Sequence, residues 1–203
     1  MIYGEKIYAS WRLRLQPLLR EWRLAHVERV ALLARDLAEH WRLDGDLAYA
    51  AGFLHDVARD LSVQELSALA AKMNIEIGPA ELASPIILHA PVGAVLLARD
   101  WGIDDPQILE AVRTHTIAEP GMTGLSRVLY LADLIEPGRE PFNGQEDLRR
   151  LIYEDLTAAM IMALASDFAR LEKQKYLIHP RAKAAYKYFQ EEQQKESTNK
   201  RGK

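Results

Sequence analysis

The apolar residues of this chain recur at helical spacing along most of its 203 positions. One helical face is marked by four residues at offsets of 0, 4, 7 and 11 positions: His26, Val30, Leu33 and Leu37. Convincing alternation of apolar and polar residues, which would indicate strands, is absent. The pattern therefore predicts an all-α fold, a compact bundle of roughly eight to ten helices.

Capping and stop signals divide this pattern into helices. Ser-Val-Gln-Glu at residues 62–65 has the form of a capping box, Pro91 and Pro106 suit first helical turns, and Pro137-Gly138 stops a helix. The expected helices span residues 22–41, 46–57, 62–73, 91–101, 106–115, 126–135, 145–175 with one break, and 180–189. We expect one folded domain over residues 1–189 and a polar, disordered tail over residues 190–203.

Charge and cysteine content exclude several classes of protein. The net charge is −3, from 26 basic and 29 acidic side chains, which argues against a nonspecific nucleic-acid binder. The chain has no cysteine, so disulfides, thiolate zinc sites and cysteine nucleophiles are excluded. No apolar run approaches the roughly 18 residues of a membrane span, and the first residues lack a signal-peptide pattern. We expect a cytoplasmic protein that binds neither nucleic acid nor membrane.

The segment AGFLHDVARDLS places two ionisable residues, His55 and Asp56, directly after an apolar run. Burial of either group costs free energy unless a partner compensates it. Neighbours in a helix project about 100° apart, so both side chains can converge on an ion that lies between them. Imidazole nitrogen and carboxylate oxygen together suit iron, manganese, zinc or a similar divalent ion. The alternative is a buried hydrogen bond between the two side chains.

Four further residues are candidate ligands because each is polar in an apolar helical context or lies where an apolar segment breaks: His26, His89, His115 and Asp133. Each also has an alternative reading, as a hydrogen-bonded core histidine or as a helix carboxylate that is partly exposed. His40 lies near a helix end, where a histidine is favoured electrostatically. His179 precedes a proline in an expected loop. We expect these last two histidines to lie outside the site.

The order His, His-Asp, His, His, Asp resembles that of the HD superfamily of metal-dependent phosphohydrolases. The similarity continues through AHVERVALLARDLAEHW, AGFLHDVARDLS, LHAPVGAVLLARDWGI, VRTHTIAEPGMTGLSRVLYLADLIEPGRE and DLRRLIYEDLTAAM. These segments are similar to the YqeK type, the symmetrical diadenosine-tetraphosphate hydrolases of bacteria. THT followed by LADLIEPGR is the most specific part. The resemblance extends from about His26 to about Tyr186.

The resemblance implies a centre of two metal ions, with iron favoured and manganese or another divalent ion as alternatives. One ion would be held by four residues: His26, His55, Asp56 and Asp133. The second would be held by His89 and His115, with Asp56 bridging the two ions. A hydroxide shared by the ions would attack phosphorus, and diadenosine tetraphosphate would yield two ADP. Nucleoside diphosphates such as ADP or GDP would then bind as products.

The same resemblance suggests residues that would act on the substrate beside Asp56. Arg59, Arg127 and Arg139 are expected to stabilise phosphate charge, with Thr116 donating a hydrogen bond. The alternative for each arginine is surface solvation or a helix C-terminal charge. Asp60 is expected to act as an acid, a base or a water-orienting group, or else to cap the next helix beside Ser62. The family often has a lysine at the position of Arg59, which keeps the charge but changes its geometry.

Other functions remain open at this point. The chain could be an HD-type nucleotidase that acts on another nucleotide, or a nucleotide-binding regulator that does no chemistry. It could also be a structural bundle whose buried histidines are simply hydrogen-bonded. The oligomeric state is not determined by one sequence, and a homodimer is possible.

Overall fold

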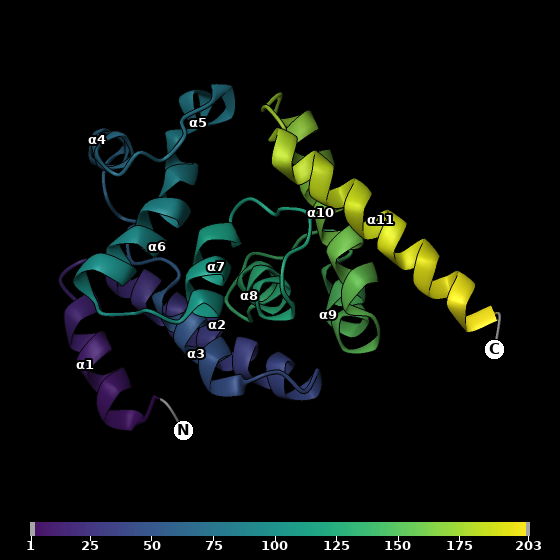
Figure 1. Ribbon diagram of the computed structural model, residues 1–203, viewed down its shortest axis with the longest axis horizontal. Helices are drawn as coiled ribbons and strands as arrows, with labels where there is room; N and C mark the ends of the chain where they lie inside the picture. The colour runs from purple at the N-terminus through teal and green to yellow at the C-terminus, as the bar shows by residue number, and fades with distance from the viewer. Residues whose placement is uncertain (1–2, 202–203) are drawn as a thin grey trace.

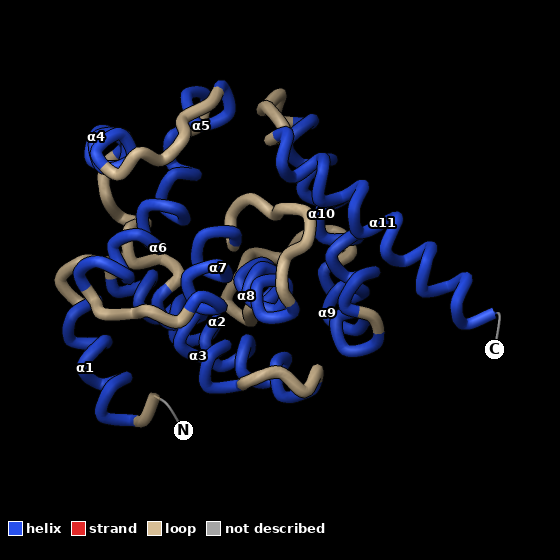
Figure 2. Tube along the Cα trace, in the orientation of Figure 1, coloured by secondary structure: helices blue, strands red, loops and turns tan. Residues whose placement is uncertain are grey.

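The computed structural model describes residues 3–201, and this part of the chain is helical with no strand, as the sequence predicts (Figure 1; Figure 2). Eleven α-helices and one 3-10 helix follow one another along it. They are α1 (Glu5–Leu15), α2 (Glu21–His40), α3 (Gly45–Leu54), α4 (Val63–Lys72), α5 (Pro79–Ala83), η1 (Pro85–Leu88), α6 (His89–Asp100), α7 (Pro106–Thr114), α8 (Gly124–Ile135), α9 (Gln145–Glu154), α10 (Leu156–Lys173) and α11 (Pro180–Arg201).

Polar side chains fix several helix starts. Ser62 caps α4, where it forms the expected capping box with Glu65. Asp105 caps α7 by accepting hydrogen bonds from the backbone N–H groups of the first turn. Asp155 does the same for α10, and it thereby marks the one break that the sequence predicts between residues 145 and 175. None of the helices within residues 3–201 is long and apolar enough to cross a membrane.

The centre of the molecule is formed by α2, α3, α7 and α8, with α6 packed on α7 (Figure 1). Helices α2 and α3 approach closely at Gly52, where an added Cβ would lie 2.7 Å from the Cα of Ala31. Both helices also bury several alanines along their length. The close packing fixes the end of α3 against α2, and the His55-Asp56 pair lies at that end.

Three features differ from the sequence expectation. Helices α1 and α5 were not expected, so eleven α-helices replace the eight to ten predicted. Helix α3 ends at Leu54, so His55 and Asp56 lie in the turn that follows and not inside a helix. The tail, expected to be disordered from residue 190, continues α11 as far as Arg201. Residues 202–203 of that tail lie outside the described part of the chain.

The extension of α11 has a tertiary cause. Phe189 is completely buried near the middle of the helix. One turn later Glu192 forms an ion pair with Arg127 of α8 at 2.8 Å and accepts a hydrogen bond from Thr157 at 3.2 Å. These contacts anchor the polar segment to the bundle, because they join it to residues far away in the sequence.

Candidate metal centre

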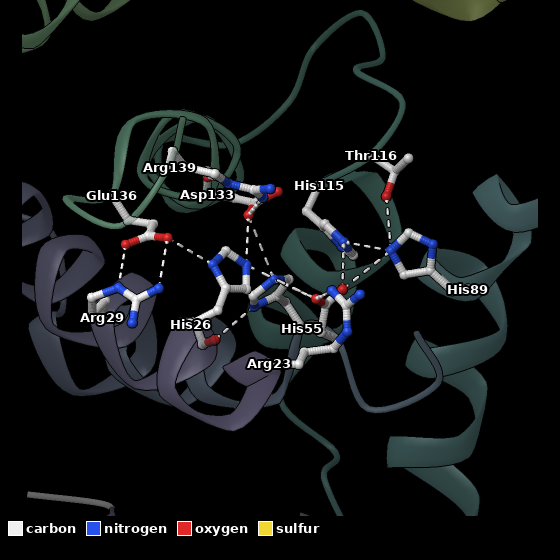
Figure 3. A network of polar contacts seen from close by, with 12 residues as sticks. Arg23, His26, Arg29, His55, His89, His115, Thr116, Asp133, Glu136 and Arg139 are labelled. Carbon is white, nitrogen blue, oxygen red and sulfur yellow. Dashed lines mark hydrogen bonds and ion pairs between the residues drawn. The ribbon is translucent and has the colours of Figure 1, made fainter. Parts of the chain in front are cut away.

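The predicted ligand residues converge on one buried site between the central helices (Figure 3). His26 comes from α2, and His55 and Asp56 directly follow α3. His89 is the first residue of α6, and His115 directly follows α7. Asp133 comes from the last part of α8. All six are buried except Asp133, which is partly buried. Residues from helix ends and from helix faces therefore meet at one place.

The histidine rings at helix ends are held in one orientation by the backbone. His55, His89 and His115 each bond through Nδ1 to the backbone carbonyl three residues earlier, at 2.7, 2.6 and 2.7 Å. In a neutral ring the Nδ1–H donates to that carbonyl, so Nε2 keeps its lone pair. This is the arrangement that orients metal-binding imidazoles in proteins. The three Nε2 atoms are therefore the ones available to a ligand.

Asp56 lies between two pairs of histidines. Its Oδ2 atom is 3.9 Å from His26 Nε2 and 3.6 Å from His55 Nε2. Its Oδ1 atom is 3.3 Å from His89 Nε2 and 3.8 Å from His115 Nε2. Two ligand atoms bound to one ion at about 2.1 Å lie about 3.0–3.4 Å apart, so these spacings are close to those of a loaded site. One carboxylate thus faces two groups of ligands, one with each oxygen.

The partly buried Asp133 completes the group around His26 and His55. Its Oδ1 is 3.0 Å from His26 Nε2 and 3.8 Å from His55 Nε2. Arg139 donates to the Asp133 backbone carbonyl at 2.7 Å and also to its carboxylate. Burial would raise the pKa of Asp133, but His26 and the charge of Arg139 outweigh it and hold the pKa well below its usual range. The carboxylate is therefore ionised and can serve as an anionic ligand.

Several nitrogen atoms of the site lack the partners that buried polar atoms normally have. Within the described residues, the buried Nε2 atoms of His26 and His55 make no hydrogen bond. Burial lowers the pKa of His55 to about 4, so its ring is neutral at pH 7. The Nε2 atoms of His89 and His115 face each other at 3.0 Å, although both rings use Nδ1 toward the backbone. A bound cation would satisfy these lone pairs, so the residues fit divalent metal ions.

A family model for the HD domain matches residues 23–138, which include every one of these candidate ligands. The chain belongs to the HD-domain family.

Relatives and solved structures agree with this assignment. The chain is 36% identical over 173 residues to the symmetrical bis(5'-nucleosyl)-tetraphosphatase of Bacillus subtilis (strain 168), covering 84% of this chain and 91% of that protein. A protein of the same name from Halalkalibacterium halodurans is 33% identical, covering 84% and 90%. A crystal structure of a "predicted HD superfamily hydrolase involved in NAD metabolism" from Clostridium acetobutylicum has a TM-score of 0.88 and 30% identity, covering 91% and 97%. The resemblance that the sequence indicates is confirmed.

A buried arginine that sequence reasoning missed holds the shared carboxylate of this HD-domain centre. Arg23 donates from Nη1 to Asp56 Oδ2 at 2.8 Å and from Nε to Asp60 Oδ1 at 2.9 Å. The other oxygen of Asp60 accepts from the backbone N–H of Arg20 at 2.9 Å. Asp60 therefore does not cap α4, which Ser62 caps, but contacts Asp56 through Arg23. The signal in the sequence was an arginine one turn before His26 on the same helix.

Glu136 is a second residue that was missed. Its carboxylate lies 3.0 Å from His26 Nδ1 and accepts hydrogen bonds from Arg29 Nε at 2.5 Å and from the Gly138 backbone N–H at 2.6 Å. Burial would raise the pKa of Glu136, but Arg29 and His26 lower it to about 2. An ionised carboxylate at Nδ1 leaves His26 Nε2 free for an ion. The sequence feature that could have indicated this role is a glutamate three residues after Asp133 and directly before Pro137.

The expected substrate-binding residues do not all reach the centre. Thr116 lies at its edge, with Oγ1 3.2 Å from His89 Nε2. Arg59 is partly buried near Asp56, and its guanidinium makes no hydrogen bond within the described residues. Arg139 is at the centre through Asp133. Arg127 does not contact the centre within the described residues. Glu192 binds it instead, through two hydrogen bonds at 2.8 and 3.0 Å.

The remaining histidines lie outside the HD-domain centre, as the sequence predicts. His40 Nε2 is 2.7 Å from the backbone carbonyl of Tyr153 near the end of α2. His179 is buried, and its Nε2 is 3.0 Å from Glu81 Oε1. The partners of both rings, Tyr153 and Glu81, are not among the candidate ligands.

Proposed function

We propose that this protein is a metal-dependent hydrolase that cleaves dinucleoside tetraphosphates symmetrically, with diadenosine tetraphosphate and water yielding two ADP. The observation that carries the proposal is the Asp56 carboxylate, which faces one pair of histidines with each of its oxygens. It is supported by the HD-domain match and by relatives of nearly equal length that carry this activity in their names.

We infer that the centre takes two divalent ions. Four residues would hold the first: His26, His55, Asp56 and Asp133. His89 and His115 would hold the second, together with Asp56, and these three already form one of the ligand groups. When bound, the ions would acidify water and neutralise charge on the phosphoryl oxygens. The nitrogen and oxygen donors suit iron, which the resemblance favours, and also manganese.

The protein's own side chains would position the polyphosphate. Within the described residues the Arg59 guanidinium makes no hydrogen bond, so it is the cation best placed to bind phosphate oxygens beside the centre. Thr116 would donate a hydrogen bond from its hydroxyl group to a phosphate oxygen at the His89 side of the centre. Arg139 would stabilise the charge of the leaving nucleoside diphosphate from the Asp133 side. Arg127 is not part of this proposal, because its hydrogen bonds within the described residues go to Met122, Thr157 and Glu192 and to none of the candidate ligands.

Asp60 would act indirectly. Its carboxylate holds Arg23, and Arg23 holds Asp56, so the three residues fix the position of the shared ligand. Each of these side chains is almost fully buried, with 9% or less of its surface exposed. We therefore assign Asp60 a positioning role in place of the acid–base role that the sequence suggested.

Chromatographic product analysis tests the proposal. Anaerobically purified protein with its metal content measured is incubated with diadenosine tetraphosphate, and we expect ADP as the sole nucleotide product. ATP with AMP would contradict symmetric cleavage. No turnover by protein that contains metal would contradict the enzymatic function, and would favour the nucleotide-binding regulator.

A further inference from the structure

A cavity of about 610 Å³ lies beside the metal centre and has no role in the site described above. Its walls come from the segment after α4, from α5, α6 and α7, and from the start of α11 (Figure 1). Leu88 and Ala90 in its wall are the chain neighbours of His89, and Ile117 follows Thr116. Figure 3 shows His89 and Thr116 together at one side of the centre, away from Glu136. We call this cavity the side pocket.

The side pocket has the size and the apolar walls of a small-molecule site. Ligand pockets measure roughly 300–1,000 Å³ and are lined mainly by apolar side chains with a few polar groups. One wall is a run of small or branched residues of α6: Ala90, Pro91, Ala94 and Val95. Leu109 of α7 and Ile117 also line the cavity. An apolar lining of this kind suits a planar aromatic group such as a nucleobase.

The charged groups of the side pocket are predominantly acidic. Four carboxylates line it, from Glu76, Glu81, Glu110 and Glu119. The guanidiniums that line it belong to Arg113 and Arg181, and both bind Glu119 Oε1, at 2.7 and 3.0 Å. A polyphosphate would be repelled by this excess of negative charge, whereas a group rich in hydrogen-bond donors would be attracted.

We propose that the side pocket binds one nucleoside of the dinucleoside polyphosphate. This inference rests on the proposed function. The exocyclic amine of adenine and the ribose hydroxyls are donors that the carboxylates can accept. Glu110 is suited to this, because Oε1 accepts from the Thr123 backbone N–H at 3.2 Å while Oε2 has no hydrogen bond within the described residues.

The separation of acidic groups in the side pocket from basic and metal-binding groups at the centre would orient the bound substrate. The acidic pocket accepts the nucleoside, and the basic and metal-binding groups accept the phosphates. The depth at which the nucleoside is held then decides which phosphorus reaches the centre. The side pocket would therefore contribute to symmetric cleavage by setting the register of the chain of phosphates.

Filling the pocket tests the proposal. Ala94 is 7% exposed and lines the pocket, so Ala94→Phe directs a ring into the space for the nucleoside. Binding of adenosine is measured by ligand-observed NMR, and binding of inorganic pyrophosphate by calorimetry. We expect adenosine to bind about tenfold more weakly to the variant, a loss of about 1.4 kcal/mol, with pyrophosphate unchanged. The matched control is Ala165→Phe, at an exposed position of α10 outside the pocket.

A second variant keeps the test valid if Ala94→Phe does not fold. Glu110→Gln leaves the size of the side chain unchanged and removes one carboxylate, and we expect weaker adenosine binding and a higher KM for diadenosine tetraphosphate. Wild-type affinity for adenosine in both folded variants would overturn the proposal, and so would pyrophosphate binding that is lost together with adenosine. If the wild-type protein binds adenosine but cleaves no dinucleoside polyphosphate, the proposed function fails while the nucleoside site stands.

Discussion

The two halves of the candidate metal centre differ in how one of their histidines is held. In the half that contains His26 and His55, a carboxylate holds only the first ring: Glu136 contacts His26 Nδ1, and Arg29 contacts Glu136. His55 Nδ1 bonds to a backbone carbonyl. Around His89 and His115, backbone carbonyls orient both rings, and no carboxylate contacts their Nδ1 atoms within the described residues. A carboxylate at Nδ1 makes a histidine a more basic ligand than a carbonyl does.

This difference suggests that the two halves have different roles. The His26 half is buried behind ion pairs and is suited to holding an ion firmly. The His89 half adjoins Thr116 and the side pocket, so we expect it to face the nucleoside that the side pocket would bind. Asp56 joins the two halves, and Arg23 fixes Asp56 from behind.

Replacing the residue that both halves share should have the largest effect. Asp56→Asn keeps the size of the side chain but removes the charge that faces all four histidines. We expect the rate of hydrolysis to fall on the order of a thousandfold or more, about 4 kcal/mol in the barrier. Product chromatography and metal analysis measure the loss, and circular dichroism shows that the variant is folded.

His40→Gln is the matched control, because this histidine lies outside the centre. It should keep full activity. An Asp56→Asn protein that retains both ions and wild-type turnover would contradict a shared ligand and would leave the two halves independent.

Glu136→Gln and Thr116→Ala compare the halves directly. Loss of the Glu136 charge should weaken metal binding about 10–100-fold, the usual effect of removing a carboxylate behind a histidine ligand. Thr116→Ala should leave metal affinity unchanged and raise the KM for the dinucleotide. Competition with a fluorescent chelator measures affinity without any need for activity. Equal losses of metal affinity in both variants would erase the distinction between the halves.

Asp60→Asn should have a smaller effect and decides the role of that residue. If Asp60 positions Arg23, we expect about a tenfold loss of turnover with an unchanged pH profile. If Asp60 were itself a general acid or base, the loss would be about 10²–10⁴-fold and one limb of the pH profile would disappear. Arg23→Lys should resemble Asp60→Asn in the first case, since both weaken the same hold on Asp56.

The sequence predicts which candidate ligands come together better than it predicts the residues that hold them in place. His55 and Asp56 are recognisable because an apolar helix rarely ends in two unpaired ionisable groups. Arg23 and Glu136 look like ordinary charged residues, since their role depends on partners 33 and 110 residues away. Side-chain supports of this kind are tertiary contacts, which spacing along one helix does not reveal.

The tail and Arg127 illustrate the same limit. A polar composition predicts disorder when no partner is known. Here Glu192 of the tail binds Arg127 of α8, so this contact helps to anchor the tail to the bundle and also removes an arginine from the expected phosphate site. The all-α fold was predictable because helical periodicity is local, whereas this pair joins residues 65 positions apart.

The smallest effect should come from Glu81, which lies outside both halves and joins α5 to the start of α11. Burial would raise its pKa, but hydrogen bonds with His179 and the Gly78 backbone N–H outweigh it, so the pKa lies below the ordinary value. A carboxyl group with a lowered pKa in the folded state stabilises the protein above its unfolded pKa, about 4.3, and loses that contribution as pH falls through the folded value.

Glu81→Gln should therefore lower the Tm by about 2–4 °C at pH 7, and the gap to the wild type should narrow as the pH is taken to 4 and below. Thermal denaturation of the wild type and the variant across this pH range measures the difference in Tm. Metal affinity should not change, because Glu81 contacts neither half of the centre. A difference in Tm that is constant between pH 7 and 3 would mean that the carboxyl group stabilises the fold by packing alone. A loss of metal affinity in Glu81→Gln would mean that the side pocket and the candidate metal centre are mechanically coupled.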